Sequence, residues 1–123
     1  MDFNRLIRTN IPDLAQVYGG ARGRTMSSRH QSYAWPSLVE SGITQVIDLR
    51  KADSSEKLPR LCDKYKIEYF HYPVDNDKET IVKMVELMPE LCKRIDKGNF
   101  YIACAMGLHR TDITLCVYWV FYG

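Results

Sequence analysis

The stretch FYIACAMGLHRTDIT, residues Phe100 to Thr114, decides how this chain is interpreted. Its first five residues are apolar and favour a short strand, Gly107 falls in the turn that follows, and a helix is expected to begin at about Arg110. Cys104 and Arg110, with five residues between them, lie on the two sides of that turn. At the start of a helix the first backbone N–H groups lack intrahelical partners, and the positive end of the helix dipole points outward. The stretch therefore predicts a site for an anion.

Cys104 and Arg110 are residue types that can transfer a phosphoryl group through sulfur. A helix N-terminus and a nearby guanidinium can lower the pKa of a cysteine from about 8.5 to roughly 3.5–7.5, which makes it a nucleophilic thiolate. Arg110 offers a planar fork of donors that matches two phosphate oxygens. Gly107 lets the loop curl inward, and Thr111 can direct its hydroxyl at the sulfur. The expected substrate-binding residues are Ala105, Met106, Gly107, Leu108, His109 and Arg110.

The simpler interpretation is a core cysteine that happens to precede a solvated arginine. It is disfavoured because the Cys–Arg spacing and Gly107 coincide on one predicted strand–turn–helix.

The segment CAMGLHRT resembles the phosphate-binding loop, Cys-x5-Arg-Ser/Thr, of the cysteine-dependent protein tyrosine phosphatases. The chain is most similar to their small, atypical dual-specificity branch. The similarity runs from about Val17 to Tyr118 and includes YGGA, GITQVIDLR and EYFHYPVDNDKE in the family's order. One departure is Ala103, where the family usually has a histidine that helps to orient the loop and tune the thiol.

The resemblance implies a general acid on the loop that follows the Pro-Val pair. The family often has an aspartate three residues beyond the proline, and that register falls on Asn76, which cannot deliver a proton at neutral pH. Asp75 and Asp77 flank it. We expect one of them to be the acid, with Asp75 slightly ahead.

The expected function is hydrolysis of phosphate monoesters on protein tyrosine, serine or threonine, through a cysteinyl-phosphate on Cys104. No metal or cofactor is expected, because the loop and Arg110 supply the positive field. Two alternatives stay open. The stretch PVDNDKE resembles atypical phosphatases that act on inositol pyrophosphates, and Ala103 together with the uncertain acid leaves a phosphate-binding pseudophosphatase. A sulfurtransferase is less favoured, since Arg110 at the sixth position after the cysteine indicates phosphate.

Length and composition bound the setting. The 123 residues are expected to form a single domain, 1–123, with one sizeable core. A net charge of +2 gives no reason to expect a nucleic-acid partner. No run approaches the roughly 18 apolar residues of a membrane span, and the first residues lack a signal-peptide core. We therefore expect a cytoplasmic protein whose partner is a phosphorylated protein or small molecule, and we expect Cys62, Cys92 and Cys116 to be buried thiols.

The order of expected elements predicts an α/β fold, a three-layer sandwich with a mainly parallel central sheet. Asp48 and Arg50 are expected to form a buried ion pair near the site, and His71 to be a packed, hydrogen-bonded histidine. The chain is expected to have extended pieces over 3–18, a loop over 19–28, helices over 30–42, 56–66, 79–97 and 110–122, and strands over 43–50, 67–74 and 100–104.

The last expected helix is apolar on nearly every side, which requires burial all round. Related proteins usually continue with further helices beyond this point. Either the N-terminal segment or a second subunit is expected to cover it, and the sequence leaves a homodimer open.

Overall fold

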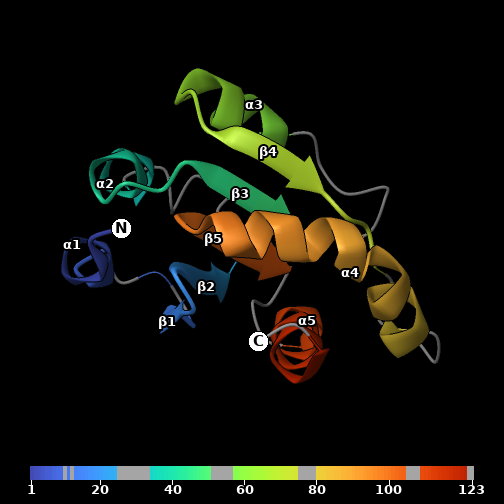
Figure 1. Ribbon diagram of the computed structural model, residues 1–123. Coiled ribbons are helices and arrows are strands. Elements are labelled where there is room, and N and C mark those ends of the chain that lie inside the picture. Colours follow the sequence, from blue (N-terminus) through green and yellow to red (C-terminus); the bar gives the residue numbers. More distant parts are fainter. Residues whose placement is uncertain are drawn as a thin grey trace.

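The computed structural model describes residues 1–9, 11, 13–24, 34–50, 57–74, 80–104 and 109–121. These residues form an α/β fold in which helices cover both faces of a five-stranded sheet (Figure 1). The strands are β1 (Ala15–Val17), β2 (Gly20–Arg24), β3 (Gln45–Asp48), β4 (Glu68–His71) and β5 (Phe100–Cys104). The helices are α1 (Phe3–Ile7), α2 (Ala34–Glu40), α3 (Lys57–Lys64), α4 (Thr80–Lys97) and α5 (His109–Phe121).

The sheet has the strand order β1-β2-β5-β3-β4. β5 lies at its centre and pairs in parallel with β2 and β3, while β4 pairs in parallel with β3. Only β1, at one edge of the described sheet, runs antiparallel to its neighbour. All residues of β3 and β5 are buried, as expected for parallel strands with helices on both faces. The predicted mainly parallel sheet is confirmed.

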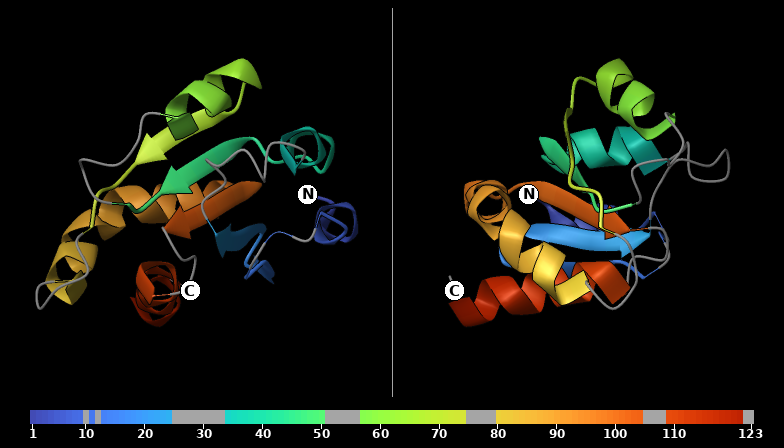
Figure 2. Two further views of the ribbon diagram at one scale, coloured as in Figure 1. Left: turned by 180° about the vertical axis from the view of Figure 1, so that it is seen from behind. Right: turned by 90° about the vertical axis from the view of Figure 1, so that its right-hand side faces the viewer.

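Two apolar cores flank the sheet, and together they make the three layers of the predicted sandwich (Figure 2). On one face α1, α2 and α3 contribute Leu6, Trp35, Leu38, Leu58 and Cys62. On the other face α4 and α5 contribute Met84, Met88, Leu91, Ile95, Leu115 and Tyr118.

The beginning of the chain differs from the sequence prediction. Residues 3–7 form helix α1 instead of an extended piece, because the Asp2 side chain caps it by accepting the Arg5 backbone N–H at 3.3 Å. Residues 20–24 form strand β2 instead of a loop. Gly23 is needed there, since a Cβ at this position would collide with the hydroxyl oxygen of Tyr101 on β5. The glycines that suggested a loop serve close strand packing.

The later elements follow the prediction, although β3 and β4 are shorter than the strands expected over 43–50 and 67–74. β4 stops at His71, two residues before Pro73, which has no N–H to donate to a ladder. α4 contains Pro89 and bends along its length in Figure 1, as a proline in a helix predicts. The Gln45 side chain donates to the carbonyls of Arg94 and Gly98 at 2.7 and 3.0 Å, which ties the end of α4 to the sheet.

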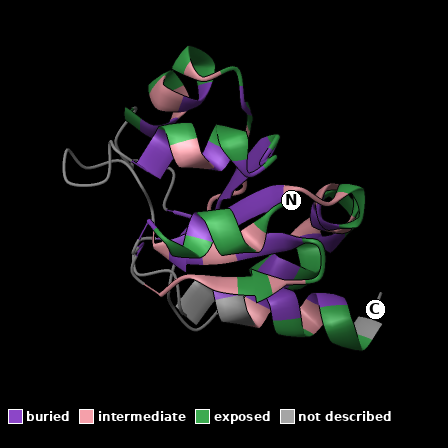
Figure 3. Ribbon diagram, turned by 90° about the vertical axis from the view of Figure 1, so that its left-hand side faces the viewer, coloured by how far each residue is buried: buried purple, intermediate pink, exposed green. Residues whose placement is uncertain are grey.

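One expectation about burial is wrong, and a second stays a prediction. Cys62 is buried, but Cys92 is only half-buried and Cys116 is exposed. Burial of α5 all round stays a prediction that needs a second subunit. Within the single chain Trp119 and Val120 are 65% and 66% exposed, and exposed ribbon is visible along α5 in Figure 3. The reason is their position: Cys116, Trp119 and Val120 are three and four residues apart and so share the outer side of the helix. The N-terminal segment reaches only part of α5, where Tyr18 packs edge-on against Tyr118.

Candidate active site

Cys104 is the last residue of β5, and α5 begins at His109. The cysteine is 1% exposed and belongs to the core beneath α4 and α5. Arg110 therefore lies in the first turn of α5. The predicted strand and helix are confirmed. The turn expected between them, residues 105–108, and the side chains of His109 and Arg110 lie outside the description. Their roles in binding phosphate stay a prediction.

Thr111 follows Arg110 in the first turn of α5 and is 0% exposed. Its Oγ1 has no hydrogen-bond partner among the residues that the structure describes. Burying a hydroxyl without a partner costs about 1–3 kcal/mol. A catalytic role is one explanation of such a group in a native structure. The predicted role, in which this hydroxyl stabilises the Cys104 sulfur, stays a prediction.

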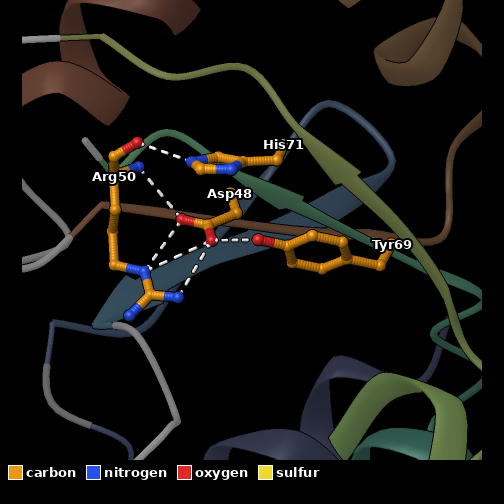
Figure 4. A network of polar contacts seen from close by, with 4 residues as sticks. All are labelled: Asp48, Arg50, Tyr69 and His71. Carbon is orange, nitrogen blue, oxygen red and sulfur yellow. Dashed lines mark hydrogen bonds and ion pairs between the residues drawn. The ribbon is translucent and has the colours of Figure 1, made fainter. Parts of the chain in front are cut away.

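A buried polar network lies beside β5 at the carboxyl end of β3 (Figure 4). Asp48 Oδ1 accepts the Arg50 backbone N–H and the Arg50 Nε–H, both at 3.0 Å. Asp48 Oδ2 accepts from Arg50 Nη2 at 3.0 Å and from the Tyr69 hydroxyl at 2.5 Å. The His71 ring nitrogen Nε2 lies 2.7 Å from the Arg50 carbonyl oxygen. The predicted ion pair and the predicted hydrogen-bonded histidine are both confirmed.

The network keeps Asp48 ionised. Burial alone would raise the pKa of Asp48, but hydrogen bonds from Arg50 and Tyr69, together with the Arg50 charge, hold it below the ordinary value. Burial raises the pKa of a neighbouring thiol, Cys62, to about 12, and the negative charge of Asp48 adds to the shift. Cys62 is therefore a neutral core thiol.

Arg22 and Arg24 lie on β2 and both contact Asp13. Both belong to the segment 19–28 that is expected to be a loop, but residues 20–24 form a strand. Arg24 Nη2 lies 3.3 Å from Asp13 Oδ2, and Arg22 Nη1 donates to the Asp13 carbonyl at 3.4 Å. The signal that could have found this strand is the alternation of small and charged residues in Ala21-Arg22-Gly23-Arg24.

No protein-family model and no curated protein matches the sequence. Solved structures do match the fold. The core catalytic domain of the PP-IP phosphatase SIW14 from S. cerevisiae superposes with a TM-score of 0.68 at 13% identity, over 89% of this chain and 67% of that chain. Kinase associated phosphatase, with its catalytic cysteine substituted by serine, superposes with a TM-score of 0.63 at 18% identity, over 94% of this chain and 70% of that chain. A mutant form of Tk-PTP superposes with a TM-score of 0.63 at 20% identity, over 89% of this chain and 71% of that chain.

The fold is that of the cysteine-dependent phosphatases. Within this phosphatase fold Ala103, at the position before Cys104, is buried among residues of the core on the opposite face. It pairs in register with Asp48 on β3 and with Gly23 on β2. Its small side chain therefore lies on the sheet face that also carries the Asp48 network. Asp75 and Asp77 lie outside the described residues, so the choice between them stays a prediction.

The described part of this phosphatase fold has two further features. None of its helices is long and apolar enough to cross a membrane. In the same residues no three His, Cys, Asp or Glu side chains gather as a group that could hold a metal ion.

Proposed function

We propose that this protein is a phosphatase that hydrolyses phosphate monoesters on protein side chains through a cysteinyl-phosphate intermediate. The observation that carries the proposal is the position of Cys104. It ends the central strand of a phosphatase fold, and Arg110 follows in the first turn of the next helix. This is where an anion is favoured by unpaired backbone N–H groups and the helix dipole.

In the proposed reaction the Cys104 thiolate attacks phosphorus, and the bond from phosphorus to the leaving oxygen breaks. Arg110 and the backbone N–H groups of residues 105–110 stabilise the charge on the phosphoryl oxygens. A carboxylic acid, Asp75 or Asp77, gives its proton to the leaving oxygen. Water, deprotonated by the same carboxylate, then attacks the phosphocysteine and releases inorganic phosphate and the Cys104 thiolate. The Thr111 hydroxyl stabilises the sulfur as it leaves.

A second substrate class is favoured by one comparison. SIW14 is a PP-IP phosphatase, and the stretch PVDNDKE in this chain resembles phosphatases of inositol pyrophosphates. Polyphosphorylated inositol is therefore the alternative substrate. The pseudophosphatase alternative rests on Ala103, because the family's histidine is absent, and on Asn76 at the acid register.

We further propose that the protein acts in the cytoplasm. None of its four cysteines, all of which lie in described segments, forms a disulfide. Disulfides are typical of oxidising compartments and rare in the cytosol. The proposed partner is a phosphorylated protein or small molecule. Self-association through the exposed side of α5 is a further proposal, supported by Trp119 and Val120.

Steady-state turnover of p-nitrophenyl phosphate tests the proposed function. Cys104→Ser should abolish turnover while keeping affinity for vanadate, and Arg110→Lys should lose both, since an ammonium cannot replace a bidentate fork. Cys116→Ser is the matched control, because this thiol lies exposed on the outer side of α5. Undiminished turnover in Cys104→Ser would refute the mechanism. A comparison of phosphotyrosine peptide, phosphoserine peptide and polyphosphorylated inositol then identifies the substrate class.

A further inference from the structure

Arg24 lies directly beside the proposed nucleophile, although the two are far apart in sequence. It is the last residue of β2, and it pairs in parallel register with Cys104, the last residue of β5. Neighbouring strands are about 4.8 Å apart, and residues in register project from the same face of a sheet. That face is the one covered by α4 and α5, since Cys104 belongs to their core. The Arg24 side chain therefore leaves the sheet at the position next to Cys104.

The Arg24 side chain is neither solvated like a surface arginine nor saturated like a core one. Its Nε is buried and has no hydrogen-bond partner among the described residues. Its Nη2 forms one ion pair of 3.3 Å with Asp13, in which the two side chains are 40% and 29% exposed. A guanidinium has five N–H donors. Of these donors, the described residues use one, on Nη2.

The ion pair with Asp13 is weak enough to be exchanged. Pairs as exposed as this one contribute about 0–1 kcal/mol, whereas an arginine and a phosphate can form two parallel charged hydrogen bonds. A phosphate that reaches Arg24 would replace the Asp13 carboxylate. Arg22 differs, because it lies two residues farther from the carboxyl end of β2 and donates to the Asp13 backbone carbonyl.

We propose that Arg24 is a specificity residue that binds a second anionic group on the substrate, next to the phosphate that Cys104 attacks. The inference rests on the proposed function and deepens it. The preferred substrates then carry two neighbouring phosphates, and Asp13 holds the guanidinium until such a substrate arrives. Monophosphates use only the loop that follows Cys104.

The test compares an inositol monophosphate with a vicinal inositol bisphosphate, measuring kcat and KM for each. In Arg24→Ala and Arg24→Gln the KM for the bisphosphate should rise roughly tenfold more than the KM for the monophosphate, the lower end of the range for a charged hydrogen bond. Asp13→Asn should lower the ratio of the bisphosphate KM to the monophosphate KM, because it releases the Arg24 guanidinium. Arg22→Ala is the matched control and should leave the ratio unchanged. Peptides with one and with two adjacent phosphorylated residues form a second arm, which separates a protein source of the second phosphate from a small-molecule one.

The inference would be overturned if KM changed equally for the monophosphate and the bisphosphate in both Arg24 variants. It would also be overturned if the ratio of the two KM values stayed unchanged in the Arg24 and Asp13 variants alike. Absence of turnover in the parent protein would instead contradict the proposed function. In that case calorimetric binding of the same inositol phosphates to Cys104→Ser, with and without Arg24→Gln, gives the ratio directly. Equal affinities in the two proteins would then reject the role of Arg24.

Discussion

Asp48 is the residue whose removal should damage the fold most. It is fully buried, and Arg50, which it neutralises, is nearly so. Asp48→Ala leaves a buried guanidinium without its carboxylate, which typically costs about 3–5 kcal/mol. We expect that loss in the free energy of unfolding, measured in urea. Tyr69→Phe is the control, because Asp48 Oδ2 keeps its hydrogen bond from Arg50. This change should lower the free energy of unfolding by only about 0.5–1.5 kcal/mol.

The same carboxylate predicts acid lability. The folded protein holds the pKa of Asp48 below its ordinary value. A depressed pKa stabilises the fold above the unfolded-state value of about 3.9, and that stabilisation is lost as the pH falls through the folded value. Urea unfolding between pH 7 and pH 2 should show stability falling below about pH 4. In Asp48→Asn the fall should be shallower, and an unchanged pH dependence would contradict the assignment.

The general acid is the second prediction at the scale of single residues. General acid–base catalysis typically contributes about 10²–10⁴-fold. Asp75→Asn, or Asp77→Asn if that residue is the acid, should lower turnover of an alkyl phosphate by that order. Turnover of an activated aryl phosphate should fall less, because its leaving group needs no proton. If neither change has this effect, the acid is absent and the pseudophosphatase interpretation gains.

At the level of residues the sequence predicted what local chemistry dictates. The buried ion pair of Asp48 and Arg50 follows from charges at the end of an apolar strand, and His71 follows from its place in an aromatic strand. Arg24 was missed because its importance comes from its register with Cys104. Register between strands that are far apart in sequence depends on tertiary pairing, which no local pattern contains.

The outer side of α5 is an apolar surface on a single element. Trp119 and Val120 are exposed there, and the exposed Cys116 adjoins them. If the helix packs against a second copy of the chain, light scattering at micromolar concentration should detect a dimer. Trp119→Lys should dissociate it by placing a charge in the interface, without loss of stability because the side chain is exposed. A monomeric parent that binds no apolar dye would contradict self-association.

Long periodic elements were predictable and short ones were not. α4 repeats its apolar residues with helical spacing over five turns, and β3 lies in the segment ITQVIDL, which is rich in β-branched and apolar residues, so each has a strong local signal. α1 has only five residues, and its existence depends on the Asp2 cap. β2 is rich in glycine because Gly23 makes room for Tyr101, and the same glycines indicate a loop when the partner strand is unknown.

For the molecule as a whole we predict loss of stability at high pH. The hydrogen bond from the Tyr118 hydroxyl on α5 to Asp96 on α4, together with burial, raises the pKa of Tyr118 to about 12. A raised pKa stabilises the fold fully below the unfolded-state value of about 10, and that contribution is lost as the pH rises toward the folded value. The half-buried Tyr69 and the buried Tyr101 have raised pKa values as well.

Thermal unfolding followed by circular dichroism between pH 9 and pH 12 measures this effect. The melting temperature should fall mainly above about pH 10, and Tyr118→Phe should reduce the fall because it removes one of the titrating groups. Tyr18→Phe is a useful comparison, since Tyr18 contacts Tyr118 but donates only to the Leu115 carbonyl. An identical pH dependence in Tyr118→Phe would reject the contribution of this pair.

The strand order has a consequence for the protein during its synthesis. β2 and β3 follow one another along the chain, but β5, which begins at Phe100, lies between them in the sheet. Until β5 leaves the ribosome, the inner edges of both strands have no partner, and an unpaired edge is a template for pairing with other chains. The described sheet cannot close before β5 is made, and pairings this distant in sequence form slowly. Until then the unpaired edges of β2 and β3 expose the nascent chain to aggregation.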